Sequence, residues 1–103
     1  MTRTPLPNRR LHETLKFTHW NLRYIAGLGR ARPGAPISEV FLNCGKSGEQ
    51  VQTLARDSAV ILSLALQHGV TIDELRHALT RNADGSPSGP LGALLDLMQD
   101  ETV

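Results

Sequence analysis

The hydrophobic pattern of the chain changes its period near residue 47. Before that point β-favouring residues are dense across residues 14–28, and Trp20-Asn21 offers a turn near the middle, which predicts a β-hairpin. Two glycines and two prolines then interrupt residues 29–36. The apolar run over residues 37–44 predicts a third strand. The first half of the chain therefore predicts a three-stranded antiparallel meander.

From residue 47 onward, apolar residues recur at helical spacing. They predict one long helix over residues 47–68, with Leu62 and Leu66 facing the sheet. The second half of this helix is apolar nearly all round, so we expect it to be buried on several sides. Ser47 and Gln50 form a capping-box pattern at its start.

Two shorter helices are predicted after the long one. Gly69 supplies a left-handed stop, and Thr71 with Glu74 repeats the capping-box pattern ahead of a helix over residues 72–81. A turn-rich connector follows, and Pro90 is well placed to begin a third helix, whose apolar positions are Leu91, Leu94, Leu95 and Met98. The expected fold class is α+β, a three-stranded antiparallel meander followed by one long buried helix and two shorter helices.

Length and charge limit the choice of function. The chain has 103 residues, of which 40% are hydrophobic, and this is enough for one compact domain. Its formal net charge is only +1, so no strong overall field draws it toward nucleic acid or anionic lipid. Basic residues crowd the first third and acidic residues close the chain. We expect residues 1–12 to be a flexible basic arm, residues 13–98 the folded domain and residues 99–103 an acidic tail.

Cys44 is the single cysteine, which excludes an internal disulfide and fits a reducing compartment. No pair of Cys and His has the spacing of a zinc site, so we expect neither a metal nor a cofactor. No apolar segment is long enough to span a bilayer, and the N-terminus lacks the apolar region of a signal peptide. The sequence thus predicts a cytoplasmic protein with no membrane partner.

The best candidate site is the tetrapeptide Gly45-Lys46-Ser47-Gly48, which joins the third predicted strand to the long helix. Unpaired N–H groups at a helix start, beside a lysine, suit one phosphate or carboxylate. The segment is not a phosphate-binding loop of the nucleotide triphosphatases, because the position five residues before Gly45 is Val40 and not glycine. The alternative is that the two glycines only shape the turn and that Lys46 is solvated.

The other reactive side chains point less clearly to chemistry. Cys44 lies near the positive end of the predicted helix, which favours a thiolate, but a small buried hydrophobe is the alternative. Arg56 and Asp57 lie in the helix beside an apolar run, so at least one of them is expected to be a paired structural charge at the edge of the core. No metal spacing links the four histidines, which are His12, His19, His68 and His77. We therefore assign no catalytic residue.

Residues 64–81 support a rival interpretation. Alanine in the first helix, glycine in the turn and apolar anchors in the second helix are typical of a helix-turn-helix, so a DNA-binding regulator is the alternative function. The second helix offers only Arg76, His77 and Arg81 beside two acidic residues, which is thin for a surface that must meet phosphates. DNA is therefore not the expected partner.

Three segments together resemble a known family, the TSCPD domain. They are Glu39-Val40-Phe41-Leu42, Gly45-Lys46-Ser47-Gly48 and the helical stretch over residues 59–69 with the following Val70. The TSCPD domain is a C-terminal appendage of adenosylcobalamin-dependent ribonucleotide reductases, and the resemblance covers residues 13–98. The Thr-Ser-Cys-Pro-Asp segment and the paired redox cysteines of such reductases are absent here, so no catalytic residue is carried over.

The resemblance implies a ribonucleotide-reductase-related accessory or binding module in DNA synthesis. We expect it to hold a nucleotide phosphate or a reductase-type protein partner at the strand-to-helix turn, without catalytic activity of its own. An independent enzyme ranks third, since only Cys44 and Lys46 offer chemistry and neither has an evident partner group. The sequence leaves open whether the chain forms a homo-oligomer.

Overall fold

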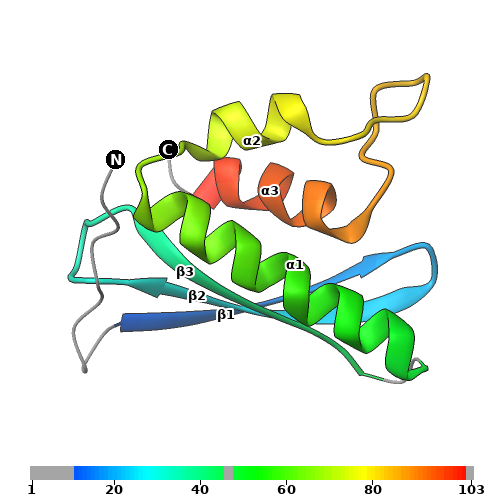
Figure 1. The fold of residues 1–103 in the computed structure, drawn as a ribbon, viewed down its shortest axis with the longest axis horizontal. Coiled ribbons are helices and arrows are strands. Elements are labelled where there is room, and N and C mark those ends of the chain that lie inside the picture. The colour runs from blue at the N-terminus through cyan, green and yellow to red at the C-terminus, as the bar shows by residue number, and fades with distance from the viewer. Residues whose placement is uncertain (1–10, 46–47, 102–103) are drawn as a thin grey trace.

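The computed structural model describes residues 11–45 and 48–101, with side chains for 12–45 and 48–98. Three strands are followed by three helices (Figure 1). Their bounds are β1 Leu11–His19, β2 Leu22–Arg30, β3 Ile37–Cys44, α1 Glu49–Gln67, α2 Ile72–Ala78 and α3 Pro90–Glu101. The strands form one antiparallel sheet in the order β1-β2-β3. The predicted α+β class and the predicted meander are confirmed.

The hairpin turn lies where the sequence predicts it. His19 stands opposite Leu22, so only Trp20 and Asn21 connect β1 to β2. Both have positive φ, 50° and 65°, which is the conformation of a two-residue turn whose twist matches that of the strands. β1 begins at Leu11, two residues before the expected start of the folded domain.

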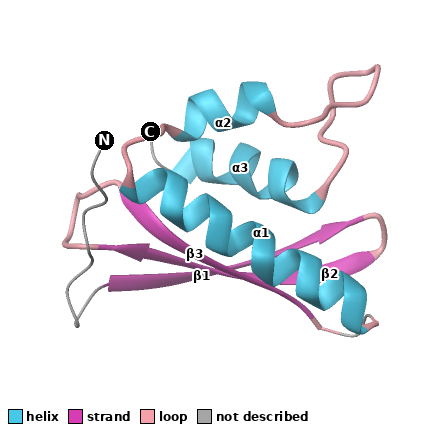
Figure 2. Ribbon diagram, in the orientation of Figure 1, coloured by secondary structure: helices cyan, strands magenta, loops and turns pink. Residues whose placement is uncertain are grey.

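All three helices lie on one side of the sheet (Figure 2). α1 packs along β3, α3 lies beside α1 and touches β1, and α2 packs on α3. The largest fully buried side chains come from both layers and are Leu28, Val40, Leu42, Cys44, Leu62, Leu94, Leu95 and Met98. Among the described residues, no helix or strand lies over the other face of the sheet.

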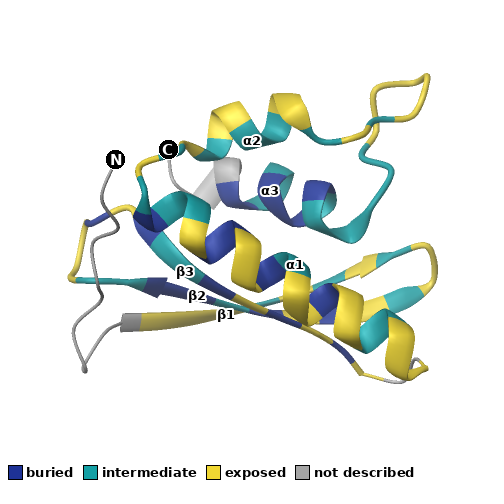
Figure 3. Cartoon of the chain, in the orientation of Figure 1, coloured by how far each residue is buried: buried dark blue, intermediate teal, exposed yellow. Residues whose placement is uncertain are grey.

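The outer side of α1 is exposed, which corrects the prediction of a helix buried on several sides. Leu62 is 2% exposed, as expected, and Leu66 packs at the edge of the core. By contrast, the exposed fractions on the outer side are large: Leu54 60%, Val60 57%, Ile61 68% and Leu64 40% (Figure 3). The reason is that one small sheet and two short helices can cover only the inner side of a 19-residue helix.

Side chains of α1 close the outer edge of β3. The Ser63 hydroxyl accepts the Val40 N–H at 2.8 Å and lies 3.0 Å from the Val40 carbonyl oxygen and 2.8 Å from that of Ala59, so it can donate to either. Two further bonds run from Gln67 Nε2 to the Ser38 carbonyl at 3.0 Å and from the Cys44 N–H to Gln52 Oε1 at 2.8 Å. Because these groups point away from β2, the side chains of α1 take the place of a fourth strand.

The two shorter helices also start where predicted. Thr71 and Glu74 make the capping box at the start of α2, and α3 begins at Pro90. α2 ends at Ala78, three residues earlier than expected, because Leu79 is already extended with ψ 156°. Arg81 lies beyond the helix and forms an isolated bridge with Pro87.

Candidate functional site

The structure describes part of the predicted site. Gly45 and Gly48 are placed, whereas Lys46 and Ser47 lie outside the described residues. The Gly45 N–H donates to the Arg23 carbonyl at 3.3 Å, which ties the end of β3 to β2. Gly48 occupies the N-cap of α1, the position that the sequence pattern gave to Ser47. The predicted N-cap is thus one residue too early, because α1 begins at Glu49, and the capping box predicted for Ser47 with Gln50 lies outside the described residues.

Neither glycine is required by its own geometry. Gly48 has φ −63° and ψ 162°, which any residue can adopt, and Gly45 has no positive φ. A Cβ atom added at either glycine would meet nothing within 4 Å. The interpretation that these glycines only shape the turn is thus unsupported at both positions. What glycine does achieve here is to leave the backbone bare to an approaching group.

The N-cap residue of α1, Gly48, has no side chain with which to cap the helix. No side chain bonds to its first turn from the N-cap, and the Gln52 N–H is the one that reaches the Gly48 carbonyl, at 3.2 Å. The N–H groups of the three residues before Gln52 have no acceptor within the helix. Glu49 is the acidic residue of this first turn and is exposed. Donors in this position suit an anion, whereas the nearby carboxylate of Glu49 would repel it.

Basic side chains lie beside this turn on the open face of the sheet. Lys16 pairs with Ile25 and Arg23 pairs with Thr18, so the two cations are diagonal neighbours on that face. They flank a shallow depression of about 320 Å³. Because Arg23 is also the residue bonded to Gly45, the cations lie at the end of the sheet where the turn begins.

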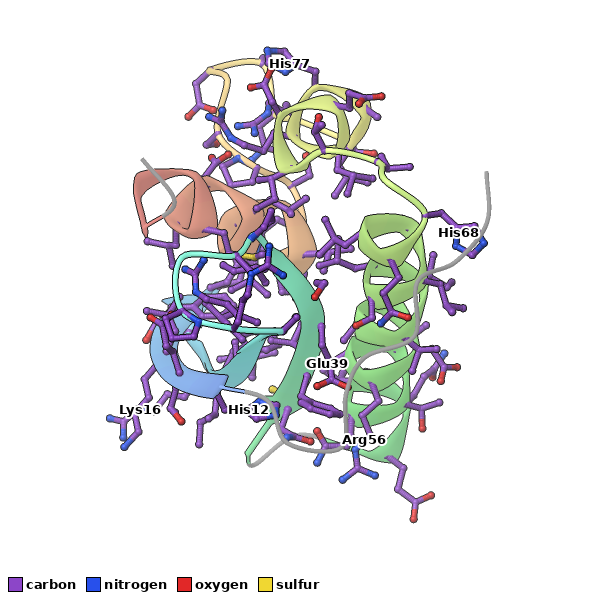
Figure 4. The ribbon with its side chains drawn as sticks, turned by 90° about the vertical axis from the view of Figure 1, so that its left-hand side faces the viewer. His12, Lys16, Glu39, Arg56, His68 and His77 are labelled. Carbon is purple, nitrogen blue, oxygen red and sulfur yellow. The ribbon has the colours of Figure 1, made fainter. Side chains whose placement is uncertain are left out.

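Arg56 adds a third cation from α1. Its Nε donates to Asn43 Oδ1 at 3.2 Å, and Asn43 stands opposite Ile25 in the sheet. Figure 4 shows Lys16 and Arg56 on the side of the molecule opposite to His77 of α2. The sequence analysis missed Lys16 and Arg23 as site residues. The available signal was the two-residue turn, which fixes the register and so places both cations on one face.

Cys44 is buried and is not a surface thiol. Its side chain belongs to the core cluster and is 1% exposed. Burial, followed by the neighbouring Cys44, raises the pKa of the Tyr24 phenol above its usual value. The structure therefore supports the small buried hydrophobe and not the reactive thiolate.

Each histidine has a separate local contact. His12 stacks on Phe41 and lies 3.6 Å from Glu39, and His19 Nε2 lies 3.3 Å from the Ser88 carbonyl. The other two each approach a carbonyl of their own helix through Nδ1: His68 that of Leu64 and His77 that of Asp73. Within the described part of the chain, no group of three or more His, Cys, Asp or Glu residues could hold a metal ion.

Comparison with known proteins decides the family. The model of the TSCPD domain matches residues 8–98, nearly the whole chain. The chain belongs to the TSCPD domain family. Over 78 residues it is also 33% identical to the vitamin B12-dependent ribonucleotide reductase of Agrobacterium fabrum strain C58. The aligned region makes up 76% of this chain but only 6% of that protein. No solved structure matches it significantly.

The geometry of this TSCPD domain gives the DNA-binding alternative no support. Arg76 and Arg81 both bind Asp96 of α3, at 3.0 Å and 2.7 Å. The hydrogen bond from Arg81 lowers the pKa of the Asp96 carboxyl, against partial burial, and Arg76 acts in the same direction. Both arginines therefore fasten α2 and its following loop to α3.

Over the described residues, no helix is long and apolar enough to cross a membrane.

Proposed function

We propose that this TSCPD domain is an accessory module of ribonucleotide-reductase type that binds a phosphate-bearing ligand, a nucleotide foremost, at the turn between β3 and α1. It performs no chemistry of its own. The observation that carries the proposal is that Gly48, a residue without a side chain, occupies the N-cap of α1, and that neither backbone conformation nor packing requires glycine there or at Gly45. A phosphate can accept from the N–H groups of this first turn, because the N-cap glycine offers no side chain to them.

The surrounding charges favour an anion at this position. Lys46 belongs to the turn itself, and Arg23 and Lys16 lie on the adjoining end of the open face. Together they would attract a phosphate over a distance that shortens as salt is added. The carboxylate of Glu49 opposes this attraction, so we expect modest affinity for inorganic phosphate and stronger binding of nucleotides with several phosphates.

The family relationship supports a nucleotide as the ligand. The relative is named as a ribonucleotide reductase, and the matched region is a small part of it. Its substrates, as the name states, carry phosphate. A module that holds such a substrate, or a nucleotide that regulates the reductase, would assist ribonucleotide reduction. It would not need redox cysteines of its own.

A thermal-shift titration tests the proposal. We expect ribonucleotides and deoxynucleotides at millimolar concentration to raise the melting temperature, because a ligand that binds only the native state stabilises it. Lys46→Ala should weaken this binding about tenfold, which is about 1.4 kcal/mol, without lowering the melting temperature of the free protein. Arg32→Ala is the matched control, since Arg32 is exposed in the loop at the opposite end of β3.

The proposal fails if neither nucleotides nor phosphate shift the melting temperature of the parent protein. The second candidate function, docking of a protein partner, then takes its place. The open face favours that candidate because Ile25, Phe41 and Trp20 expose large apolar side chains there and at its hairpin turn. Ile25→Ser should then weaken binding to a purified ribonucleotide reductase, whereas Lys46→Ala should not.

A further inference from the structure

The outer side of α1 carries four of the large apolar side chains that the structure exposes, Leu54, Val60, Ile61 and Leu64. No described helix or strand of the same chain covers them (Figure 3). A helix that is apolar on both sides is normally buried on both sides. The apolar stripe on the outer side of α1 thus remains exposed to solvent when one copy folds.

Three of these four residues have the spacing of a helix-packing seam, and Val60 lies beside it. Leu54, Ile61 and Leu64 are separated by seven and three residues, and Gln50, Asp57 and His68 continue the same alternation of four and three. The seam therefore runs over residues 50–68. At 1.5 Å per residue it is about 27 Å long, close to the whole length of α1.

The seam has the same spacing when it is read backwards. Its intervals are four, three, four, three and four residues, with the midpoint at Ala59. A second copy running antiparallel would set Leu54 against Leu64 of the other copy and Gln50 against His68 of the other copy. In these outer pairs apolar meets apolar and polar meets polar, whereas the two central pairs set Asp57 against Ile61. An isologous contact needs a spacing that is the same in both directions, because the same patch must fit itself.

We propose that the outer face of α1 is the interface of a two-fold dimer in which the α1 helices of two copies pack antiparallel. The centre of the seam limits its strength, since each Asp57 faces Ile61 of the other copy. The strip, about 27 Å long and one helix diameter of about 10 Å wide, also falls short of the roughly 800 Å² per partner of a standard interface. The dimer is therefore reversible and depends on protein concentration.

Sedimentation velocity of the full chain over a wide concentration range tests this dimer. The parent should pass from monomer to dimer, Ile61→Asp should stay monomeric, and Asp57→Leu should dimerise at least tenfold more tightly. Ile61 is exposed in the single copy, so its replacement should leave the melting temperature of the monomer unchanged. Ile25→Asp on the open face of the sheet is the control and should dimerise like the parent.

Disulfide trapping tests the direction of the helices. Leu54→Cys mixed with Leu64→Cys should give a disulfide-linked pair, because the two Cα atoms would lie within the 4.4–6.8 Å that a disulfide spans. Either variant alone should not, since ten residues of helix separate its two cysteines by about 15 Å. The native Cys44 is buried and does not compete.

Three results would overturn the proposal. A parent protein that stays monomeric at every concentration removes the dimer. Loss of the dimer in Ile25→Asp but not in Ile61→Asp moves the interface to the open face of the sheet. Self-linking of Leu54→Cys alone means that the helices run parallel, which contradicts the antiparallel arrangement.

Discussion

The two faces of the sheet are built from the same strands and have opposite roles. On the covered face, Tyr24, Ala26 and Leu42 are at most 4% exposed. On the open face, the intervening Ile25 and Phe41 are 44% and 49% exposed. The covered face therefore carries the free energy of folding, whereas the open face is free to carry charge and apolar surface for binding. Substitutions should separate accordingly into those that change stability and those that change affinity.

The largest loss of stability is expected from the covered face. Leu62→Ala removes a buried side chain of α1 that packs in the core, and the lost burial together with the cavity should cost roughly 2–5 kcal/mol. Urea denaturation measures this free energy. Leu54→Ala is the matched control on the outer side of the same helix, and at concentrations that keep the protein monomeric it should cost far less. Equal losses would mean that α1 is not oriented as described.

A smaller loss is expected at the edge of the covered face. Ser63→Ala removes the hydroxyl that serves the N–H and carbonyl of Val40, so those backbone groups would lose their partner at a cost of about 1–3 kcal/mol. Ser58→Ala deletes a hydroxyl on the same helix that donates to the Leu54 carbonyl in an exposed position, and it should be nearly neutral. If the two variants denature alike, α1 does not close the edge of β3 through Ser63.

The contact of α2 and its following loop with α3 should contribute still less to stability. Asp96→Ala breaks the bonds from Arg76 and Arg81, and since Asp96 is about one-third exposed we expect a loss of about 1–2 kcal/mol at neutral pH. The pKa of Asp96 is lowered in the folded state, so its contribution is complete above the unfolded pKa of about 3.9 and disappears as the pH falls through the folded value.

Denaturation at a series of pH values measures that contribution. The difference between the parent and Asp96→Ala should be constant from neutral pH down to about 4 and should shrink only below it. A difference that vanishes already near neutral pH would show that the three side chains are not paired in solution.

The smallest effect is expected on the open face. Ile25→Thr keeps a β-branched residue in β2 and changes only an exposed position, so stability should change by less than about 0.5 kcal/mol. Val40→Thr makes a similar change on the covered face of β3 and should cost about 1–3 kcal/mol, because it buries a hydroxyl. A large effect of Ile25→Thr would mean that the open face is covered in the folded protein.

Local signals in the sequence predicted the elements of this fold. Trp20-Asn21, the pair Thr71 and Glu74, and Pro90 mark turns and helix starts through their own backbone chemistry, and each lies where expected. The outer side of α1 could not be predicted this way. Its apolar residues carry the same periodic signal whether they face a core or solvent, and the outcome depends on how many other elements exist to cover them.

The candidate site was predicted only in part, for a related reason. Gly45 and Gly48 directly precede the long helix in the sequence, so they can be recognised from sequence order alone. Lys16 and Arg23 join that region through strand register, which is a property of paired segments and not of any single one. Cations on neighbouring strands can therefore be recognised as one group only after the register of the hairpin is known.

The closed edge of β3 also bears on what happens when this protein is crowded. Fibres built by strand addition grow because every molecule offers two open edges, one to receive a neighbour and one to recruit the next. Here Ser63, Gln67 and Gln52 already occupy outward groups of β3, which leaves β1 as the receiving edge of the described sheet. We therefore expect edge-to-edge association through β1 to give a pair, because a further strand at β3 would have to displace these side chains of α1.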